Sequence, residues 1–279
     1  MYGTSKLKTI KASKANNYTA LRFFVFFLFA LISINISAQK LKVIAYNIEF
    51  AKSTTIHEMY SFLKTQKADV ICLSEVPGQG WTKKLGELLG MKYSYEGKTA
   101  SANHMEEYRD KTGDYFGKYK SILSKYPLEN PHEIILKGDR WSPASTVAAT
   151  VKVSKKKSVL VFSLHIPTGT DDPEKSKACF LAQVLKNNYS GYDRVILAGD
   201  FNDHYDSEPM KCLYDLGYKN PYSSLNIDLS RSCSLSRENI NGKVIDHILY
   251  KGLKVKKAGI TEQRSLSDHK PVWALFKLK

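Results

Sequence analysis

YDRVILAGDFND, residues 192–203, is an apolar run that ends abruptly in polar side chains. A run of this length, rich in aliphatic residues, predicts a buried strand. Asp200 and Asn202 stand two positions apart at its end, so their side chains face the same way if the segment stays extended. Gly199 lets the chain turn sharply beside them. A buried strand with such an end predicts a polar site at the edge of a sheet.

Five other apolar runs share this feature, because each carries or adjoins residues that a protein core would not select. Those residues are Asn47 after VIAY, Glu75 after VICLS, His165 after VFSL, Asp246 after VI, and Asp268 with His269 before PVWALF. Burying one such group without a partner costs about 1–3 kcal/mol, and more if the group is charged. A turn, a cap or a satisfied core histidine explains any single case. Six strands with the same feature indicate that their ends meet in one cleft.

The rest of the pattern predicts the elements around that cleft. Strands are expected at 40–50, 68–76, 117–124, 144–153, 158–166, 192–203, 243–250 and 269–278, and helices at 54–67, 81–90, 172–189 and from about 206. Helices alternate with strands early in the chain, whereas strands follow one another in the middle and at the end. This mixture favours α/β layers with mixed or largely antiparallel sheets over a purely parallel doubly wound fold. No repeat or linker divides the chain after its first residues, so one domain is expected there.

Residues 1–38 have the composition of a secretory signal peptide. Five cations and no acid occupy 1–22, the apolar run FFVFFLFALISINI follows at 23–36, and a small residue, Ala38, precedes the expected cut. The apolar run is shorter than the roughly 20 residues that a bilayer span needs, which favours cleavage over a retained membrane anchor. We therefore expect a secreted or periplasmic protein.

Removal of residues 1–38, which hold five cations and no acid, lowers the formal net charge from +15 to +10 and leaves 241 residues. A basic surface favours polyanions such as nucleic acid or anionic lipid, although a basic protein without such a partner has the same composition. Four cysteines are too few for a disulfide scaffold, even after export. Cys72 is expected in a buried strand, and Cys212 and Cys233 are the expected candidates for a disulfide.

The residue types at the strand ends restrict the chemistry. Glu75, Asp268 and the Asn47 amide are hard oxygen donors with no thiolate among them, which favours Mg²⁺ or Mn²⁺. In the pair Asp200 and Asn202, one side chain can orient or activate a nucleophile while the other donates to an anionic oxygen.

Histidines complete the set of groups that carry chemistry. His165 and His269 are suited to proton transfer near neutral pH or, when charged, to stabilising a phosphoryl anion. Asp246 can hold His269 in the useful tautomer. Together with the lack of a serine or cysteine nucleophile motif, these residue types indicate metal-assisted attack of water on a phosphoester.

Seven segments in this order carry a family resemblance. They are AYNIEF, VICLSEV, YKSILSKYPL, SLHIPTG, LAGDFND, VIDHILY and SDHKPV, and the match runs from about 41 to 277. The set resembles the endonuclease/exonuclease/phosphatase superfamily, which includes deoxyribonucleases, abasic-site endonucleases, neutral sphingomyelinases and inositol-polyphosphate phosphatases. The resemblance implies one catalytic domain over 41–277, built as a four-layer α/β sandwich. Two mixed, mainly antiparallel sheets would lie face to face, with helices outside.

The resemblance also implies roles for individual residues. The metal ligands would be Asn47, Glu75 and Asp268. The catalytic residues would be His165, Asp200, Asn202, Asp246 and His269. The position of His165 resembles the second histidine of the deoxyribonuclease, sphingomyelinase and phosphatase branches, which abasic-site enzymes usually lack. Tyr119 and Arg140 are the candidates for contacts with substrate phosphate.

We therefore expect a secreted phosphoester hydrolase that depends on Mg²⁺ or Mn²⁺. The +10 charge left after cleavage favours a nuclease, because phosphate neutralisation supplies most non-specific affinity for nucleic acid. A sphingomyelinase-like phospholipid phosphodiesterase, a small-molecule phosphatase and a non-catalytic binding module on the same scaffold are the alternatives. The sequence leaves open whether His269 or Asp200 is the base.

Overall fold

The computed structural model describes residues 39–100, 118–138, 143–167, 172–236 and 242–278. Residues Lys40–Lys279 form one compact unit. Its strands are β1 (Lys40–Asn47), β2 (Val70–Val76), β3 (Tyr93–Glu96), β4 (Tyr119–Ser124), β5 (Leu128–Leu136), β6 (Ala144–Ser154), β7 (Lys157–His165), β8 (Val195–Asp200), β9 (Asp246–Lys251), β10 (Lys254–Ile260) and β11 (Val272–Lys277). Its helices are η2 (Glu49–Ala51), α2 (Ile56–Gln66), α3 (Trp81–Leu89), η4 (Pro173–Lys175), α4 (Lys177–Asn188), α5 (Glu208–Tyr214) and α6 (Pro221–Ser224). None of the helices in these ranges is long and apolar enough to cross a membrane.

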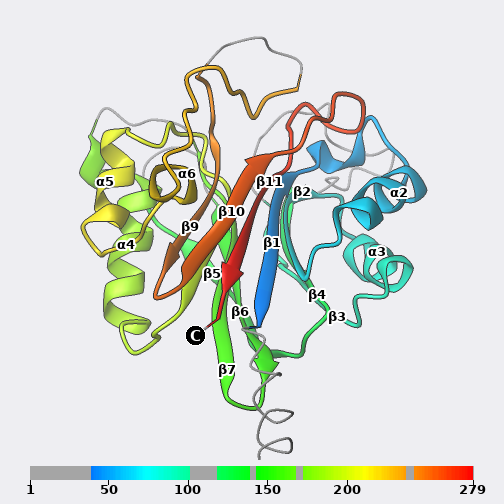
Figure 1. Cartoon of the computed structure of the whole chain (residues 1–279), viewed down its shortest axis with the longest axis horizontal. Helices are drawn as coiled ribbons and strands as arrows, with labels where there is room; N and C mark the ends of the chain where they lie inside the picture. Colours follow the sequence, from blue (N-terminus) through cyan, green and yellow to red (C-terminus); the bar gives the residue numbers. More distant parts are fainter. Residues whose placement is uncertain (1–38, 101–117, 139–142, 168–171, 237–241, 279) are drawn as a thin grey trace, which may run out of the picture. The chain divides into compact units, whose positions relative to one another are not determined.

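The strands form two sheets that pack face to face (Figure 1). One sheet has the order β10-β11-β1-β2-β4-β3 and the other the order β5-β6-β7-β8-β9. Each sheet contains one parallel pair, β1 with β2 and β7 with β8, and its other pairs are antiparallel. The expectation of two mixed, mainly antiparallel sheets is confirmed.

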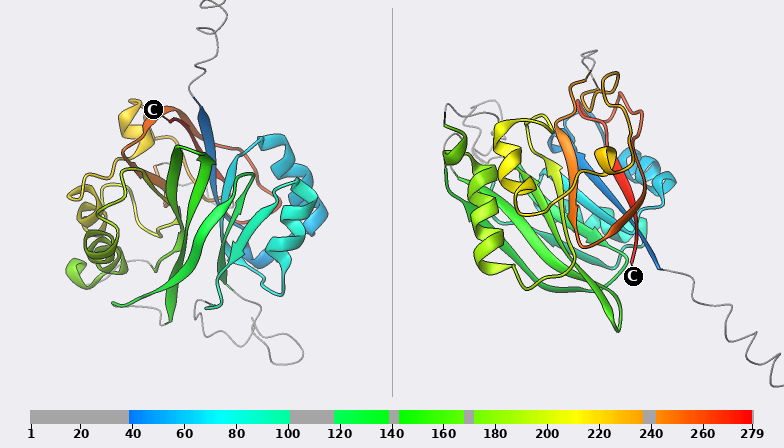
Figure 2. Two further views of the ribbon diagram at one scale, coloured as in Figure 1. Left: turned by 90° about the horizontal axis from the view of Figure 1, so that it is seen from below. Right: turned by 60° about the vertical axis from the view of Figure 1, so that its left-hand side comes forward.

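Successive side chains along a strand point alternately toward the opposite sheet and toward the outer helices. Val43 and Ala45 of β1 face the opposite sheet, where they join Val161 and Ile196 in one fully buried core. The intervening Ile44 and Tyr46 face outward against α2 and α3. A third cluster lies between the outer face of the other sheet and helices α4 and α5. Figure 2 shows these helices outside the sheets, so the four-layer α/β sandwich expected from the sequence is confirmed.

The strand directions bring the polar ends together. Because β7 and β8 are parallel and in register, His165 stands beside Asp200 at the end of both strands. Strand β9 is antiparallel to β8 and begins at the same edge, so Asp246 pairs with Asp200. On the facing sheet, β1 ends there at Asn47. One end of the sandwich therefore collects functional groups from both sheets.

Two details of the stretch at 192–203 differ from the sequence prediction. Gly199 lies within β8, where a Cβ would stand 2.0 Å from the carbonyl oxygen of Leu164, so its small size permits the close approach of β7 rather than a turn. The chain turns instead at Asn202, whose φ of 52° lies in the left-handed region that asparagine tolerates. The segment after Asp200 is therefore not extended.

The disulfide pairing expected from the sequence is wrong. Cys179 of α4 is bonded to Cys212 of α5, and their Cα atoms are 5.1 Å apart. The two helices pack side by side on the same sheet, whereas Cys233 lies in a separate loop and is a free thiol. Cys72 is fully buried in β2, as expected.

Loss of this disulfide should lower stability. Cys179 and Cys212 are 33 residues apart, and cross-links over loops of this size contribute about 2–4 kcal/mol. We expect Cys212→Ser to lower the melting temperature by about 5–15 °C, and Cys233→Ser to leave it nearly unchanged. Thermal unfolding followed by circular dichroism without reductant measures the difference. Equal melting temperatures for the wild type and Cys212→Ser would contradict the pairing.

Candidate active site

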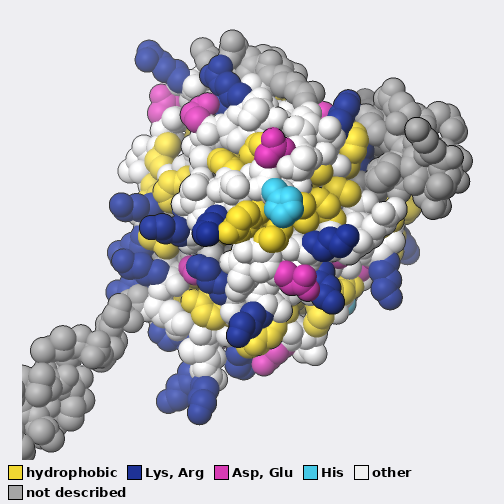
Figure 3. Space-filling model, turned by 90° about the vertical axis from the view of Figure 1, so that its right-hand side faces the viewer, with side chains coloured by type: hydrophobic (Ala, Val, Ile, Leu, Met, Phe, Trp, Pro, Cys, Tyr) yellow, Lys and Arg dark blue, Asp and Glu magenta, His cyan; other side chains and the backbone are white. Residues whose placement is uncertain are grey.

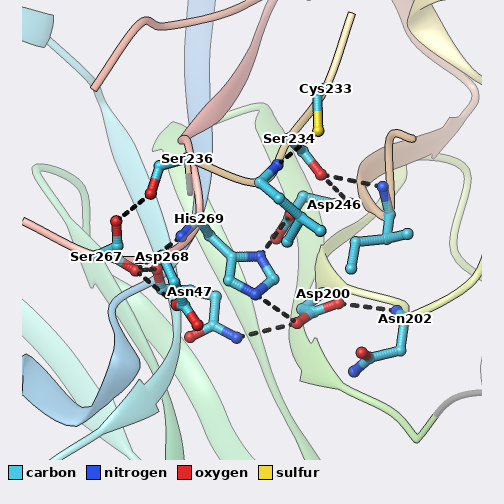
Figure 4. Close-up of polar contacts among 12 residues, drawn as sticks. Asn47, Asp200, Asn202, Cys233, Ser234, Ser236, Asp246, Ser267, Asp268 and His269 are labelled. Atoms are coloured by element: carbon cyan, nitrogen blue, oxygen red, sulfur yellow. Dashed lines mark hydrogen bonds and ion pairs between the residues drawn. The ribbon is translucent and has the colours of Figure 1, made fainter. Parts of the chain in front are cut away.

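Asp200, at the end of β8, occupies the centre of a buried polar cluster and is 1% exposed (Figure 4). Its Oδ1 accepts a hydrogen bond from the backbone nitrogen of Asn202 at 2.8 Å, and its Oδ2 accepts one from Nδ2 of Asn47 at 2.9 Å. The Nε2 atoms of His165 and His269 lie 3.5 and 3.7 Å from the same Oδ2. Groups from both sheets and from the loop before β11 therefore converge on one carboxylate.

The surroundings of Asp200 favour its protonated form. Burial, and then the charge of Asp246 on the neighbouring strand, raises the pKa of Asp200 to about 7. His269, Asn47 and the backbone of Asn202 act in the opposite direction. A carboxyl group that titrates near neutral pH is suited to general base catalysis.

His269 and Asp246 form a hydrogen-bonded pair. Nδ1 of His269 lies 2.8 Å from Oδ2 of Asp246, which is fully buried, and Nε2 of the same ring faces Asp200 (Figure 4). Burial disfavours the imidazolium, but the charges of Asp246 and Asp200 outweigh this effect and raise the pKa of His269 to about 10. The ring is therefore a cation at neutral pH, and its Nε2–H points toward Asp200.

Asn47 connects this pair to Glu75. Its Nδ2 lies 3.2 Å from Oε1 of Glu75, and its Oδ1 accepts a hydrogen bond from the backbone nitrogen of Glu49. Glu75 has a φ of 52° beside an irregularity in the pairing of β2 with β4, a conformation that costs a non-glycine residue about 1–3 kcal/mol. Burial raises the pKa of Glu75, and Lys118 and Asn47 oppose that shift. A strained backbone at the residue whose carboxylate enters the cluster is typical of a functional position.

His165 reaches the cluster from β7. Its Nε2 lies 3.6 Å from Oε1 of Glu75, and the residue is 2% exposed. Burial, and then the charges of Lys118, Lys120 and His269, lowers the pKa of His165 well below its usual value. The two histidines, which the sequence does not distinguish, thus have opposite protonation states: His165 is neutral and His269 is charged.

The surroundings of three other predicted site residues differ from one another; these residues are Asp268, Asn202 and Tyr119. Asp268 is half-buried beside Asn47, where its Oδ1 lies 3.4 Å from the Ser267 hydroxyl (Figure 4). Asn202 does not point alongside Asp200 as an extended segment would require, because its Nδ2 donates to the carbonyl of Ile166 at 2.9 Å. The ring of Tyr119 packs over Gly78 and joins the outer cluster under α3.

Arg140 lies outside the described residues. Its expected contact with substrate phosphate stays a prediction, and so does that of Tyr119.

Two serines that were not predicted from the sequence hold the site together. The Ser267 hydroxyl donates to the Asn47 carbonyl at 2.8 Å and accepts from the backbone nitrogen of His269 at 3.1 Å. The Ser234 hydroxyl accepts from the backbone nitrogens of Ile245 and Asp246 at 3.0 and 3.3 Å. Both serines are almost fully buried. Only the position of Ser267 within the SDH motif marked it beforehand, since serine is common in loops.

Two buried lysines of the segment GKYK were also missed. Nζ of Lys118 lies 3.6 Å from Oε2 of Glu75, and Lys120 is fully buried with its Nζ donating to the carbonyl of Thr99. Burial lowers the pKa of Lys120 to about 8, against the attraction of Glu133 and Glu75. Charged residues two apart at the start of an apolar strand were the available signal.

The donor set fits a hard divalent cation. Asp200, Asp246 and His269 place one ligand atom each within 4.8 Å of one another. Oδ1 of Asp246 is buried and accepts no hydrogen bond from the described residues. His269 serves poorly as a ligand because its two nitrogens face carboxylates and its proton is retained. The oxygen donors Glu75 and Asp268 suit Mg²⁺ or Mn²⁺ better.

His247, next to Asp246, points away from the cluster and should make the fold sensitive to acid. It is fully buried, with Nε2 2.9 Å from the carbonyl oxygen of Asp203, and burial lowers its pKa from 6.5 to about 4. The folded state therefore binds fewer protons than the unfolded state, so this contribution is lost as the pH falls from about 6.5 to 4. We expect the loss to be on the order of 3 kcal/mol.

Urea denaturation at pH 7.5 and pH 4 measures this effect. In His247→Gln the unfolding free energy should fall less between the two pH values than in the wild type, whereas His57→Gln, on the exposed face of α2, should behave like the wild type. An unchanged pH dependence in His247→Gln would show that another group is responsible.

Comparisons with known proteins identify a family for this chain. The model of the Endonuclease/Exonuclease/phosphatase family matches residues 44–269. No curated protein matches the chain. Among solved structures, the chain is similar to the human Nocturnin catalytic domain with bound sulfate anion at 18% identity and a TM-score of 0.64, covering 86% of this chain and 95% of that one.

Two further structures have the same fold. D. rerio TDP2 complexed with a single strand DNA product matches at 16% identity and a TM-score of 0.63, covering 86% of this chain and all of that one. The Bacteroides thetaiotaomicron mannosyl-6-phosphatase Bt3783 matches at 15% identity and a TM-score of 0.61, covering 85% of this chain and all of that one. Likeness at such low identity shows the fold, and the family match covers most of the chain. The chain therefore belongs to the endonuclease/exonuclease/phosphatase family of metal-dependent phosphoester hydrolases.

Proposed function

We propose that the protein is an exported phosphodiesterase that cleaves nucleic acid with Mg²⁺ or Mn²⁺. The observation that carries the chemistry is the buried cluster in which His165, Asn47 and His269 all face one carboxylate oxygen of Asp200. Burying this many ionisable groups costs free energy, because each of them loses its hydration. Their retention in the interior is therefore best explained by a function.

Each residue then has a task in one in-line displacement. Asp200 accepts a proton from the water whose oxygen forms the new bond to phosphorus. His269, positioned by Asp246, donates its Nε2 proton to the oxygen whose bond to phosphorus breaks. His165 donates a hydrogen bond to a non-bridging oxygen, where negative charge grows in the transition state. Asn202, whose Nδ2 already donates to the Ile166 carbonyl, has one amide hydrogen left for the same purpose. The assignment of Asp200 as base follows from its central position, and the charge of His269 fits the role of the acid.

Glu75 and Asp268, with the Asn47 amide, would hold the divalent ion. Such an ion would supply Lewis-acid polarisation of a phosphate oxygen and would offset the negative charge of the cluster. Nζ of Lys118 lies 3.6 Å from the same carboxylate of Glu75.

Nucleic acid is the substrate class with most support. The net charge of +10 that remains after removal of residues 1–38 favours a polyanion, and one structural neighbour holds a single strand DNA product. The exposed large apolar residues of the described chain come from different elements and loops rather than from one hairpin that could dock on a membrane; they are Leu88, Tyr93, Ile135, Tyr192 and Ile227. The likeness to a phosphatase makes a sugar phosphate the second substrate to test.

We propose further that residues 1–38 are a cleaved signal peptide and that the catalytic domain runs from about 41 to 277. The disulfide between Cys179 and Cys212 supports export, because such bonds persist in oxidising compartments. Mass spectrometry of the protein recovered from its native host should find an N-terminus at Gln39. An intact N-terminus would contradict cleavage.

Parallel assays test the substrate. The purified protein, with Mg²⁺ or with EDTA, is offered plasmid DNA, RNA, sphingomyelin and mannose 6-phosphate. We expect cleavage of DNA or RNA that EDTA abolishes. Hydrolysis confined to sphingomyelin or to the sugar phosphate would overturn the nuclease proposal while preserving the hydrolase chemistry.

A further inference from the structure

A groove of about 340 Å³ lies on the other side of the segment that carries His269. Lys270, the next residue, lines this groove, and its backbone nitrogen donates to the carbonyl of Ser234 at 2.6 Å. His269 itself is paired with Leu235 in a short β-bridge. Because successive side chains of an extended segment point to opposite sides, His269 enters the catalytic cluster while Lys270 enters the groove.

Three cations and one carboxylate line the groove. Arg231 lines it and makes no hydrogen bond or ion pair with any described residue. Nζ of Lys270 lies 3.2 Å from Oε1 of Glu262, and Nε of Arg264 lies 3.8 Å from the other oxygen of that carboxylate. The Arg264 contact is long and exposed, so it is worth little in water. Three cations against one carboxylate leave an excess positive charge, with two guanidinium groups able to bind an anion.

Apolar side chains also line the groove. Tyr222 and Leu229 are almost fully buried there, and Ile227 and Ile260 are more exposed beside them. A ligand that matches both the cations and the apolar side chains carries an anion next to a flat or apolar body. A phosphate with its adjoining nucleoside has this form, and guanidinium groups bind phosphate in a bidentate manner. The volume also lies in the range of small-ligand sites.

Net charge alone would not single out this groove. Figure 3 shows Lys and Arg side chains spread over the face formed by α2 and α3, where Lys64, Lys83 and Lys84 are exposed. Those lysines stand on convex helix surfaces. The groove differs because its cations, an apolar wall and a concave shape occur together, next to the catalytic histidine.

We propose that this groove is a second phosphate subsite. It binds a backbone phosphate and the adjoining nucleoside of a nucleic-acid strand whose scissile phosphate lies in the catalytic cluster beside His269. The inference rests on the proposed nuclease function and extends it by a binding position outside the reacting centre. Substrates of several nucleotides would reach both sites, whereas a small diester such as bis(p-nitrophenyl) phosphate reaches only the catalytic cluster.

The test compares two variants that remove the same charge. Arg231→Gln combined with Arg264→Gln removes two cations from the groove. Lys155→Gln combined with Lys156→Gln removes two exposed cations from the turn between β6 and β7. Binding of a short fluorescent phosphorothioate DNA strand is measured with Mg²⁺ by anisotropy over a range of salt concentrations, and hydrolysis of the small diester is measured in parallel.

The groove variant should bind the strand about 10–30-fold more weakly near 0.1 M salt. The slope of log affinity against log salt should decrease by about 1.4, the value for two lost contacts with a single strand. The turn variant should change neither quantity by more than about twofold. Equal losses in the two variants, or none in the groove variant, would overturn the subsite.

A further arm separates nucleic acid from lipid. If the groove variant loses binding to vesicles that contain phosphatidylserine but keeps its affinity for DNA, the groove recognises lipid phosphate and the proposal is wrong. Failure of the proposed function is recognised separately, since the wild type would then hydrolyse neither DNA nor the small diester while the binding comparison still reports on the groove.

Discussion

Replacement of Asp200 by asparagine is expected to lower kcat for Mg²⁺-dependent phosphodiester hydrolysis by about 10²–10⁴-fold. The asparagine side chain has nearly the same size and keeps one oxygen for the contact with Asn47 or with the Asn202 backbone, so the fold should persist. It lacks the basic carboxylate that would take the proton of the attacking water. The change therefore removes proton transfer while it preserves packing.

Initial rates on bis(p-nitrophenyl) phosphate measure this effect. Asp203→Asn is the matched control, because it makes the same chemical change three residues away, outside the cluster, and should retain full activity. Thermal unfolding of both variants verifies the fold. If Asp200→Asn retains activity within about tenfold of the wild type, another group is the base.

Removal of the His269 imidazole is the second change with a large expected effect. His269→Ala should lower kcat at least about 10²-fold, because the departing oxygen loses its proton donor. His57→Ala, on the exposed face of α2, should leave kcat unchanged. A fully active His269→Ala protein would remove this residue from the mechanism.

Asp246, the partner of His269, should influence the pH dependence of kcat. Burial opposes the imidazolium, and the charge and hydrogen bond of Asp246 are among the effects that raise the pKa of His269 to about 10. Asp246→Asn should therefore lower this pKa. If the charged ring is the acid, activity is lost as the pH rises through its pKa, so the alkaline limb of the kcat profile should move toward neutral pH. A purely structural role for Asp246 would lower kcat without moving the limb.

The sequence predicted the interior of the fold well and its edges poorly. Strands such as β1, β2 and β8 are buried on both faces, so they are almost continuously apolar and easily recognised. The missed strands β3, β5 and β10 lie at sheet edges. The segment of β5 contains Pro131, and β10 begins KVKK with mostly exposed side chains. Edge strands carry such residues because they must resist pairing with other chains, and these residues hide the alternation.

The candidate site was predictable where a charged residue interrupts an apolar run. Asp200 and His165 are examples, since each ends a buried strand at the same edge. The rotamers and protonation states were not predictable, because they depend on contacts across the two sheets. His269 and His165 are both histidines beside carboxylates, yet close pairing with Asp246 charges one, while burial near Lys118 keeps the other neutral.

The disulfide also depends on a tertiary contact that the sequence does not reveal. Cys212 and Cys233 were the candidate pair from the sequence, but the packing of α4 against α5 decides the pairing and brings Cys179 to Cys212. A tertiary contact between helices leaves no local pattern in the sequence.

The central hypothesis is that the buried cluster around Asp200 hydrolyses phosphoesters with a divalent ion. It is tested most directly by the hydrolysis of bis(p-nitrophenyl) phosphate by purified wild-type and Asp200→Asn proteins as Mg²⁺ or Mn²⁺ is titrated into metal-free buffer. We expect the wild-type rate to rise from background and saturate with the metal, and the variant to stay at least about 10²-fold lower throughout. A wild-type rate that ignores the metal, or a variant that follows the wild-type curve, would contradict it.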